Sequence, residues 1–139
     1  PIAGAQALGV HRMKLGAFEV TTLLDGYIDV PPTVLVGDAE VVKGLLDTSI
    51  ENGARPLRLP VNTFLVNSGE KLVLIDAGGA DKLGPTAGRL TQCLALAGTE
   101  LAQIDEVYIT HMHGDHLHGT VKPDGAALFF ECGVACLEA

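Results

Sequence analysis

The stretch THMHGDHLHG, residues 110–119, holds four of the five histidines of the chain together with one aspartate. It follows IDEVYIT, residues 104–110, whose β-branched and apolar side chains predict a strand. Side chains two positions apart on an extended backbone point the same way. His111 and His113 can therefore share one metal ion at the end of this strand.

A second pair of ligands follows at once. Gly114 allows the backbone to turn, and Asp115 and His116 can then reach a second point close to the first. Imidazole and carboxylate donors suit borderline divalent ions such as Zn²⁺, Mn²⁺ or Co²⁺. Two ions about 3.5–4 Å apart can hold a bridging hydroxide, because bound metal lowers the pKa of water towards about 7. A histidine-rich loop that binds metal only adventitiously is the alternative.

The other elements are expected to surround this loop in an α/β layered arrangement. The pattern TAGRLTQCLALAG is the best helix, and Gly98 stands where a C-terminal cap belongs. Asn67 and Gly69 supply the backbone of a turn over residues 67–70. In chain order we expect a strand over Phe18–Gly26, a helix over Asp38–Ser49 with Asp38 as N-cap, strands over Val61–Val66 and Lys71–Asp76, a helix over Thr86–Gly98 and a strand over Ile104–Thr110.

The composition indicates one globular domain with an aliphatic core. The chain has 139 residues, of which 47% are hydrophobic. Its three cysteines give no disulfide framework, and Cys93 on the apolar side of its helix is expected to be a buried small hydrophobe. The net charge of -8 weighs against a nucleic-acid partner, which needs a basic face to neutralise phosphates. The partner that we expect is a small-molecule substrate.

No membrane partner is expected, because no apolar run approaches the ~20 residues of a membrane span. The opening PIAGAQALGV has neither an initial Met nor a signal-like apolar stretch. It could be the start of a mature protein after cleavage, which slightly favours a periplasmic or secreted location. A cytoplasmic location is the alternative.

The motif HMHGDH resembles the H-x-H-x-D-H signature of the metallo-β-lactamase superfamily. Upstream, LVLIDAGG resembles that superfamily's strand ending in Asp-Thr-Gly, with Ala77 in the place of Thr. The segments FEVTTLLDGYIDVP, LVNSGEKLVLIDAG, GPTAGRL and IDEVYITHMHGDH are similar, in order and spacing, to the methyl parathion hydrolase-like branch. The resemblance covers roughly Met13 to Phe129.

This resemblance implies an αββα sandwich, of which the chain would be the N-terminal half. It implies that His111 and His113 bind a first metal, and that Asp115 and His116 bind a second, with Asp115 also orienting water. Asp76 would lie behind the site within hydrogen-bond reach of the metal loop, although a turn carboxylate with no role there is the alternative. The implied activity is a hydrolase with two divalent ions, Zn or else Mn or Co, acting on phosphotriesters or, as runner-up, lactones.

Two departures from the family pattern matter. The family follows its Asp-His with a pair of small residues, whereas His118 stands at the first of these positions, as a fifth ligand or as a solvent-facing or helix-start imidazole. The family also supplies another histidine to each metal and a bridging aspartate, and this sequence has no histidine after His118. A catalytically inactive metal-binding remnant, or half of a site completed by another chain, is therefore the alternative function.

The tail over residues 130–139, FECGVACLEA, departs from the family pattern, so residues 1–139 are interpreted as a partial domain with an atypical end. Read one base forward, one codon choice gives SNAELRASK, which resembles the expected continuation. We therefore expect a frameshift near Phe130, with a truncated or divergent protein as the alternative. A half sandwich would expose the LVLI and EVYI strands, which predicts self-association or pairing with a complementary chain through that face.

Overall fold

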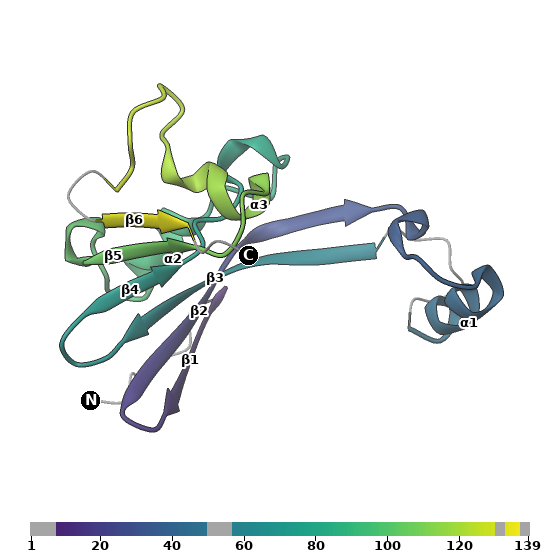
Figure 1. Cartoon of the computed structure of the whole chain (residues 1–139), viewed down its shortest axis with the longest axis horizontal. Coiled ribbons are helices and arrows are strands. Elements are labelled where there is room, and N and C mark those ends of the chain that lie inside the picture. Colours follow the sequence, from purple (N-terminus) through teal and green to yellow (C-terminus); the bar gives the residue numbers. More distant parts are fainter. Residues whose placement is uncertain (1–7, 50–56, 130–132, 137–139) are drawn as a thin grey trace.

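The structure is a computed structural model that describes residues 8–49, 57–129 and 133–136. One six-stranded sheet, in the order β1-β2-β3-β4-β5-β6, forms its centre, with α2 against one face (Figure 1). The strands are β1 (Val10–Leu15), β2 (Phe18–Val30), β3 (Leu57–Asn67), β4 (Leu72–Ile75), β5 (Glu106–Ile109) and β6 (Gly133–Cys136). The helices are α1 (Ala39–Ser49), α2 (Leu90–Leu96) and the single turn α3 (Gly114–Leu117), with 3-10 turns η1 (Pro32–Val34), η3 (Ala80–Lys82), η4 (Leu101–Gln103) and η5 (His118–Thr120). The α/β fold class expected from the sequence is confirmed.

The direction of the strands brings two distant loops together. Strands β1 to β4 pair antiparallel, and β4 then pairs parallel with β5, with Ile75 opposite Tyr108. Parallel neighbours end at the same edge of a sheet. The residues that follow β4, beginning with Asp76, therefore lie beside those that follow β5, beginning with Thr110.

The face of the sheet that packs on α2, here called the α2 face, carries the hydrophobic core. Its strand residues are completely or almost completely buried, because alternate side chains of a strand point to the same side. They pack against the apolar side of the helix, which confirms the expected helical spacing and the burial of Cys93. The strand members are Leu23, Leu65, Leu74 and Val107, and the helix members are Leu90, Cys93 and Leu94.

The opposite face, here called the open face, is only partly covered by the described residues. Phe64, Ile75 and Tyr108 lie side by side in one cross-strand row, and Phe64 is 39% exposed. Val73 in the next row is also half-buried. Each of the strands β4 and β5 therefore presents alternate residues to this face and buries the others against α2.

Helix α2 begins at Leu90, so the expectation that it starts at Thr86 is wrong. Gly88 has a φ of 83°, which interrupts a right-handed helix. Thr86 instead uses its hydroxyl to bond the backbone carbonyl of Tyr27, at 2.6 Å. The expected C-terminal cap is confirmed, since Gly98 has a φ of 77° and follows Ala97, the C-cap residue of α2.

Strands β2 and β3 extend beyond the ranges expected from the sequence, and the extension forms an arm that carries α1 at its tip (Figure 1). Arg58 donates two hydrogen bonds to Asp29 across this arm, both of 2.8 Å, and its guanidinium lies 3.9 Å from the ring centre of Tyr27. The N-cap of α1 is confirmed, because Asp38 accepts hydrogen bonds from the amides of Glu40 and Val41.

Part of the atypical tail forms a strand. Residues 133–136 make β6, which pairs parallel with β5, whereas residues 130–132 and 137–139 lie outside the described residues. Within the described part of the chain, no helix is long and apolar enough to cross a membrane.

Candidate metal centre

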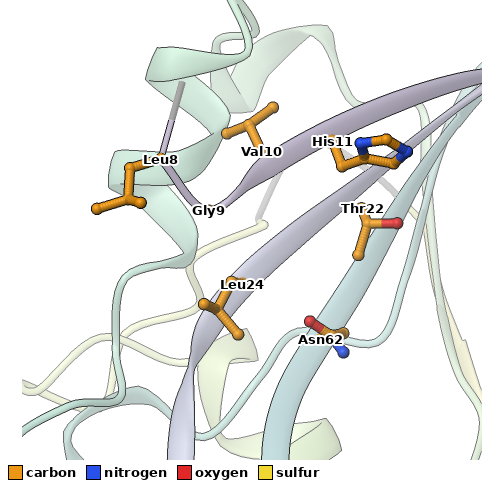
Figure 2. Close-up of a pocket in the computed structure, with 7 residues that line it drawn as sticks. All are labelled: Leu8, Gly9, Val10, His11, Thr22, Leu24 and Asn62. Carbon is orange, nitrogen blue, oxygen red and sulfur yellow. The ribbon is translucent and has the colours of Figure 1, made fainter. Parts of the chain in front are cut away.

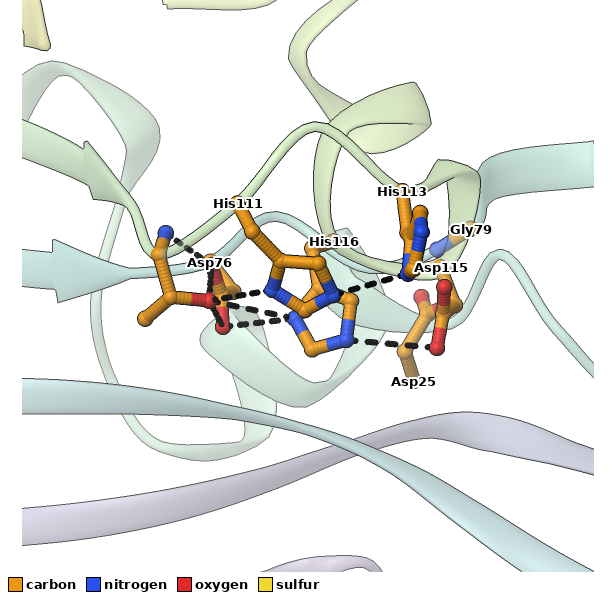
Figure 3. A network of polar contacts seen from close by, with 8 residues as sticks. Asp25, Asp76, Gly79, His111, His113, Asp115 and His116 are labelled. Carbon is orange, nitrogen blue, oxygen red and sulfur yellow. Dashed lines mark hydrogen bonds and ion pairs between the residues drawn. The ribbon is translucent and has the colours of Figure 1, made fainter. Parts of the chain in front are cut away.

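The histidine-rich stretch follows β5 as a short loop and the single turn α3 (Figure 3). The chain turns at Gly114, which is the first residue of α3. The expected donors His111 and His113 lie in the loop, and Asp115 and His116 lie in α3. All four come close together at the edge where β4 and β5 end.

Asp76 lies behind these residues with its side chain almost entirely buried. Its carboxylate accepts hydrogen bonds from the amide of Thr110 at 2.8 Å and from the Thr110 hydroxyl at 2.9 Å. It also contacts Nδ1 of His116 at 2.8 Å. Its φ of 61° is unusual for a residue other than glycine, and such left-handed backbone costs about 1–2 kcal/mol. The surrounding contacts therefore hold Asp76 in a strained conformation at this edge.

These contacts fix the orientation of His116. A carboxylate only accepts hydrogen bonds, so Nδ1 of His116 carries a proton and donates a hydrogen bond to Asp76. The lone pair is then on Nε2, which lies 3.2 Å from Oδ2 of Asp115. A carboxylate behind a histidine is the arrangement that orients metal-binding imidazoles in proteins. Nε2 of His116 and a carboxylate oxygen of Asp115 thus face each other.

The other two histidines also present facing donor atoms. Nε2 of His111 lies 3.0 Å from Nδ1 of His113 (Figure 3). His111 is half-buried, and His113 is exposed. The four expected ligands therefore form two donor pairs, one of two imidazoles and one of an imidazole and a carboxylate.

The donor chemistry of both pairs fits a borderline divalent ion such as Zn²⁺. Among the described residues, however, no three histidine, cysteine or acidic side chains converge as a ready-made metal group. Zinc in a catalytic site commonly takes three protein ligands and one water. Each pair therefore fits part of a metal cage.

His118 is the first residue of the 3-10 turn η5. The helix-start position, one of the alternatives given for it above, is therefore the one observed. Nδ1 of His118 is buried without a hydrogen-bond partner among the described residues, so this atom does not face solvent. The ring packs over Gly114, where an added Cβ would lie 2.5 Å from Cε1 of His118. His118 therefore covers the start of α3, and no observed contact makes it a fifth ligand.

Asp25 is a buried carboxylate near the site that the sequence did not single out. It is fully buried at a bulge in β2, and it accepts hydrogen bonds from the amides of Gly79, Gly88 and Leu90 at 2.9, 3.2 and 2.9 Å. It thereby holds the loop after β4, where it lies beside Gly79 (Figure 3), and from β2 it caps the start of α2. A long-range cap of this kind leaves no local sequence signal.

Two backbone hydrogen bonds tie the loop after β4 to the histidine loop. The amide of Ala77 donates to the carbonyl of His116 at 2.8 Å, and the amide of Gly119 donates to the carbonyl of Gly78 at 3.0 Å. An added Cβ at Gly119 would lie 1.7 Å from the Ala77 oxygen, so the contact requires glycine. Gly119 occupies the second of the two small-residue positions described above, and the close approach of Ala77 explains why that position is small.

The fifth histidine lies elsewhere. His11 is on β1, separated from β5 by three strands of the sheet. It lines a hollow of about 520 Å³ with Thr22, Leu24 and Asn62 (Figure 2). The donor pairs follow β5, so His11 lies apart from them in the sheet.

The fold and the segment that carries the donor pairs are similar to those of known proteins. The family model described as the metallo-beta-lactamase superfamily matches residues 56–122, which contain β4, β5 and all four donors. The crystal structure of the hydrolase AbOPH, described as in the beta lactamase superfamily, matches with 31% identity and a TM-score of 0.84, over 94% of this chain and 45% of that chain. Residues 56–122 are thus similar to the metallo-β-lactamase superfamily, and the fold is similar to that of a hydrolase described as in the beta lactamase superfamily.

Two further relatives differ in what they act on. AidC, a dizinc quorum-quenching lactonase solved with a product, is similar with 27% identity and a TM-score of 0.82, over 91% of this chain and 44% of that chain. The exodeoxyribonuclease WalJ of Streptococcus pneumoniae is 34% identical over 58 residues, which are 42% of this chain and 19% of that protein. The chain thus spans under half the length of the solved relatives and about a fifth of the curated one.

Proposed function

We propose that the chain holds four ligands of a dinuclear metal centre that hydrolyses a small ester, either a phosphotriester or a lactone. The observation that carries the proposal is the pair of converging donor sets, His111 with His113 and Asp115 with His116, behind which Asp76 fixes one imidazole. Zn²⁺ is the ion that we favour, because imidazole and carboxylate donors suit it and a dizinc lactonase shares the fold.

Bound divalent ions would supply Lewis acidity and a nucleophilic water at neutral pH. The chain's own residues hold the donors in place. Asp76 keeps the proton of His116 on Nδ1, so that Nε2 is free to bind, and Asp115 offers a carboxylate oxygen beside it. Asp115 is half-buried and acidic, so it is also suited to orient a water molecule near the reacting centre.

Both substrate classes remain within the proposal, for different reasons. The likeness of the sequence to the methyl parathion hydrolase-like branch favours phosphotriesters. The likeness to AidC favours lactones. Hydrolysis of DNA is disfavoured despite the match to an exodeoxyribonuclease, because a net charge of -8 repels a polyanion.

An assay of the purified full chain with Zn²⁺ tests the proposal. We expect hydrolysis of a chromogenic phosphotriester or of an N-acyl homoserine lactone, with loss of activity in a chelator and in His113→Ala. The control His11→Ala changes a histidine on β1 outside the cluster and should keep the activity. If neither substrate is hydrolysed, the competing proposal of a metal-binding remnant without activity is favoured, as the lack of a third described donor at either pair suggests.

We further propose that the open face associates with the open face of a second copy. The face carries an apolar row, with Phe64 39% exposed and Ile75 and Tyr108 half-buried beside it, and Val73 half-buried in the next row opposite Glu106. Apolar surface of this kind marks interfaces, and a two-fold dimer would cover the same patch on both copies. Light scattering should give a mass above that of one chain, and Val73→Glu should lower it. A monomer with a stable baseline would contradict this assembly and leave a complementary chain to be sought.

A further inference from the structure

The hydroxyl of Thr110 stands between Asp76 and His111. Its oxygen lies 2.9 Å from each carboxylate oxygen of Asp76 and 3.1 Å from Nδ1 of His111. It also lies 3.4 Å from Nδ1 of His116, a longer contact than the 2.8 Å between that nitrogen and Asp76. His116 therefore has its main partner in the carboxylate, and the short neighbours of the hydroxyl are Asp76 and His111.

The direction of the hydrogen bonds in this chain follows from donor counting. A carboxylate only accepts, and a hydroxyl has one proton to give. Because the Thr110 hydroxyl donates its one hydrogen bond to Asp76, its oxygen can only accept a hydrogen bond from His111. Nδ1 of His111 must then carry a proton, and its lone pair lies on Nε2. That nitrogen is the one that faces His113 at 3.0 Å.

We propose that Thr110 is a positioning residue. Its hydroxyl donates to Asp76 and accepts from Nδ1 of His111, and it thereby sets the tautomer of His111. One buried carboxylate then sets the tautomer of one imidazole in each donor pair, directly for His116 and through Thr110 for His111. The effect on metal binding rests on the proposed metal centre, whereas the tautomer itself does not. Thr110 touches neither substrate nor metal in this role, and it acts only through His111.

Two matched variants separate the hydroxyl from the rest of the side chain. Thr110→Val keeps the shape of the residue and removes the hydroxyl. It also leaves the backbone amide of residue 110 to donate to Asp76, a bond of 2.8 Å that holds the loop after β5. Thr110→Ser keeps the hydroxyl and removes only a methyl group. Both variants are therefore expected to fold, which circular dichroism checks.

The first measurement is the tautomer of His111 in the metal-free full chain, from ¹⁵N chemical shifts at a pH where the imidazole is neutral. We expect the Nδ1–H form in the wild type and in Thr110→Ser, and a mixture of both forms in Thr110→Val. The tautomer of His116 should not change in any of them. A His111 tautomer that is the same in wild type and Thr110→Val would overturn the proposal, as would an equal change in Thr110→Ser.

The second measurement is metal affinity, by titration with Zn²⁺. Loss of an outer hydrogen bond to a metal-binding histidine typically costs 10–100-fold in affinity, so Thr110→Val should weaken one binding event by about 10-fold. Thr110→Ser should restore it. If the wild type binds no metal, the proposed function fails, yet the tautomer measurement still decides the role of Thr110. If metal binds and Thr110→Val binds it as tightly as wild type, the proposed role of Thr110 fails alone.

Discussion

The two faces of the sheet differ in how completely this chain covers them. On the α2 face, Leu23, Leu74 and Val107 are fully buried against the helix. On the open face, their strand neighbours stay partly exposed, with Phe64 at 39%. Among the described residues, the side-chain contacts that hold the loop after β4 come from the α2 side. Asp25 reaches the loop after β4 from the α2 side, and that loop holds the histidine loop through backbone hydrogen bonds.

The largest loss of stability is expected at Asp25. Asp25→Ala leaves the buried amides of Gly79 and Leu90, and the nearby amide of Gly88, without their acceptor. A buried group without a partner costs about 1–3 kcal/mol, so the variant should lose at least about 3 kcal/mol in the free energy of unfolding. Urea denaturation measures this loss.

The control for this variant is Asp81→Ala, which removes an exposed carboxylate from the same loop. It should change the free energy of unfolding by less than about 0.5 kcal/mol. Equal losses in the two variants would mean that Asp25 is not the anchor of the loop.

Adjacent residues of β4 sharpen the contrast between the faces. Leu74 is fully buried on the α2 face, and Leu74→Ala should cost about 2–5 kcal/mol because it leaves a cavity. Ile75 points to the open face and is only half-buried, so Ile75→Ala should cost roughly 1 kcal/mol. The same denaturation experiment compares the two. A larger loss for Ile75→Ala would show that the open face is covered in solution.

The smallest effect is expected in the arm, away from both faces. The hydrogen bonds from Arg58 hold the pKa of Asp29 below its ordinary value of 3.8, and Asp29 in turn raises the pKa of Arg58. A carboxyl with a lowered pKa stabilises the fold above its unfolded pKa, and this stabilisation is lost as the pH falls through the folded pKa. Thermal melts of wild type and Asp29→Asn should therefore differ slightly at neutral pH and converge below about pH 4. A gap that widens on acidification would contradict this.

Local patterns predicted much of the fold correctly. The N-cap at Asp38, the turn between β3 and β4 and the C-terminal cap at Gly98 all depend on neighbours in the sequence. The start of α2 was predicted wrongly, because it is set by Asp25 on β2. The edge strand β1 was not predicted, because it is largely exposed and its polar side chains give no clear alternation.

In the candidate site too, the features set by local spacing were predicted, and those set by contacts between distant residues were not. The spacing of His111 and His113, and of Asp115 and His116, was enough to predict two donor pairs. The left-handed backbone of Asp76 and the contacts of Thr110 depend on the parallel pairing of β4 with β5, which no local pattern encodes. Which nitrogen of each imidazole faces its partner follows only from these contacts.

The most direct test of the account is a Zn²⁺ titration of the full chain and of single alanine variants at the four donors. If the donors form two pairs, His111→Ala and His113→Ala should each weaken the same binding event, and Asp115→Ala and His116→Ala should each weaken the other. His11→Ala should bind as the wild type does. Binding that none of the four donor variants changes, or that His11→Ala changes as strongly, would contradict the two-pair metal centre.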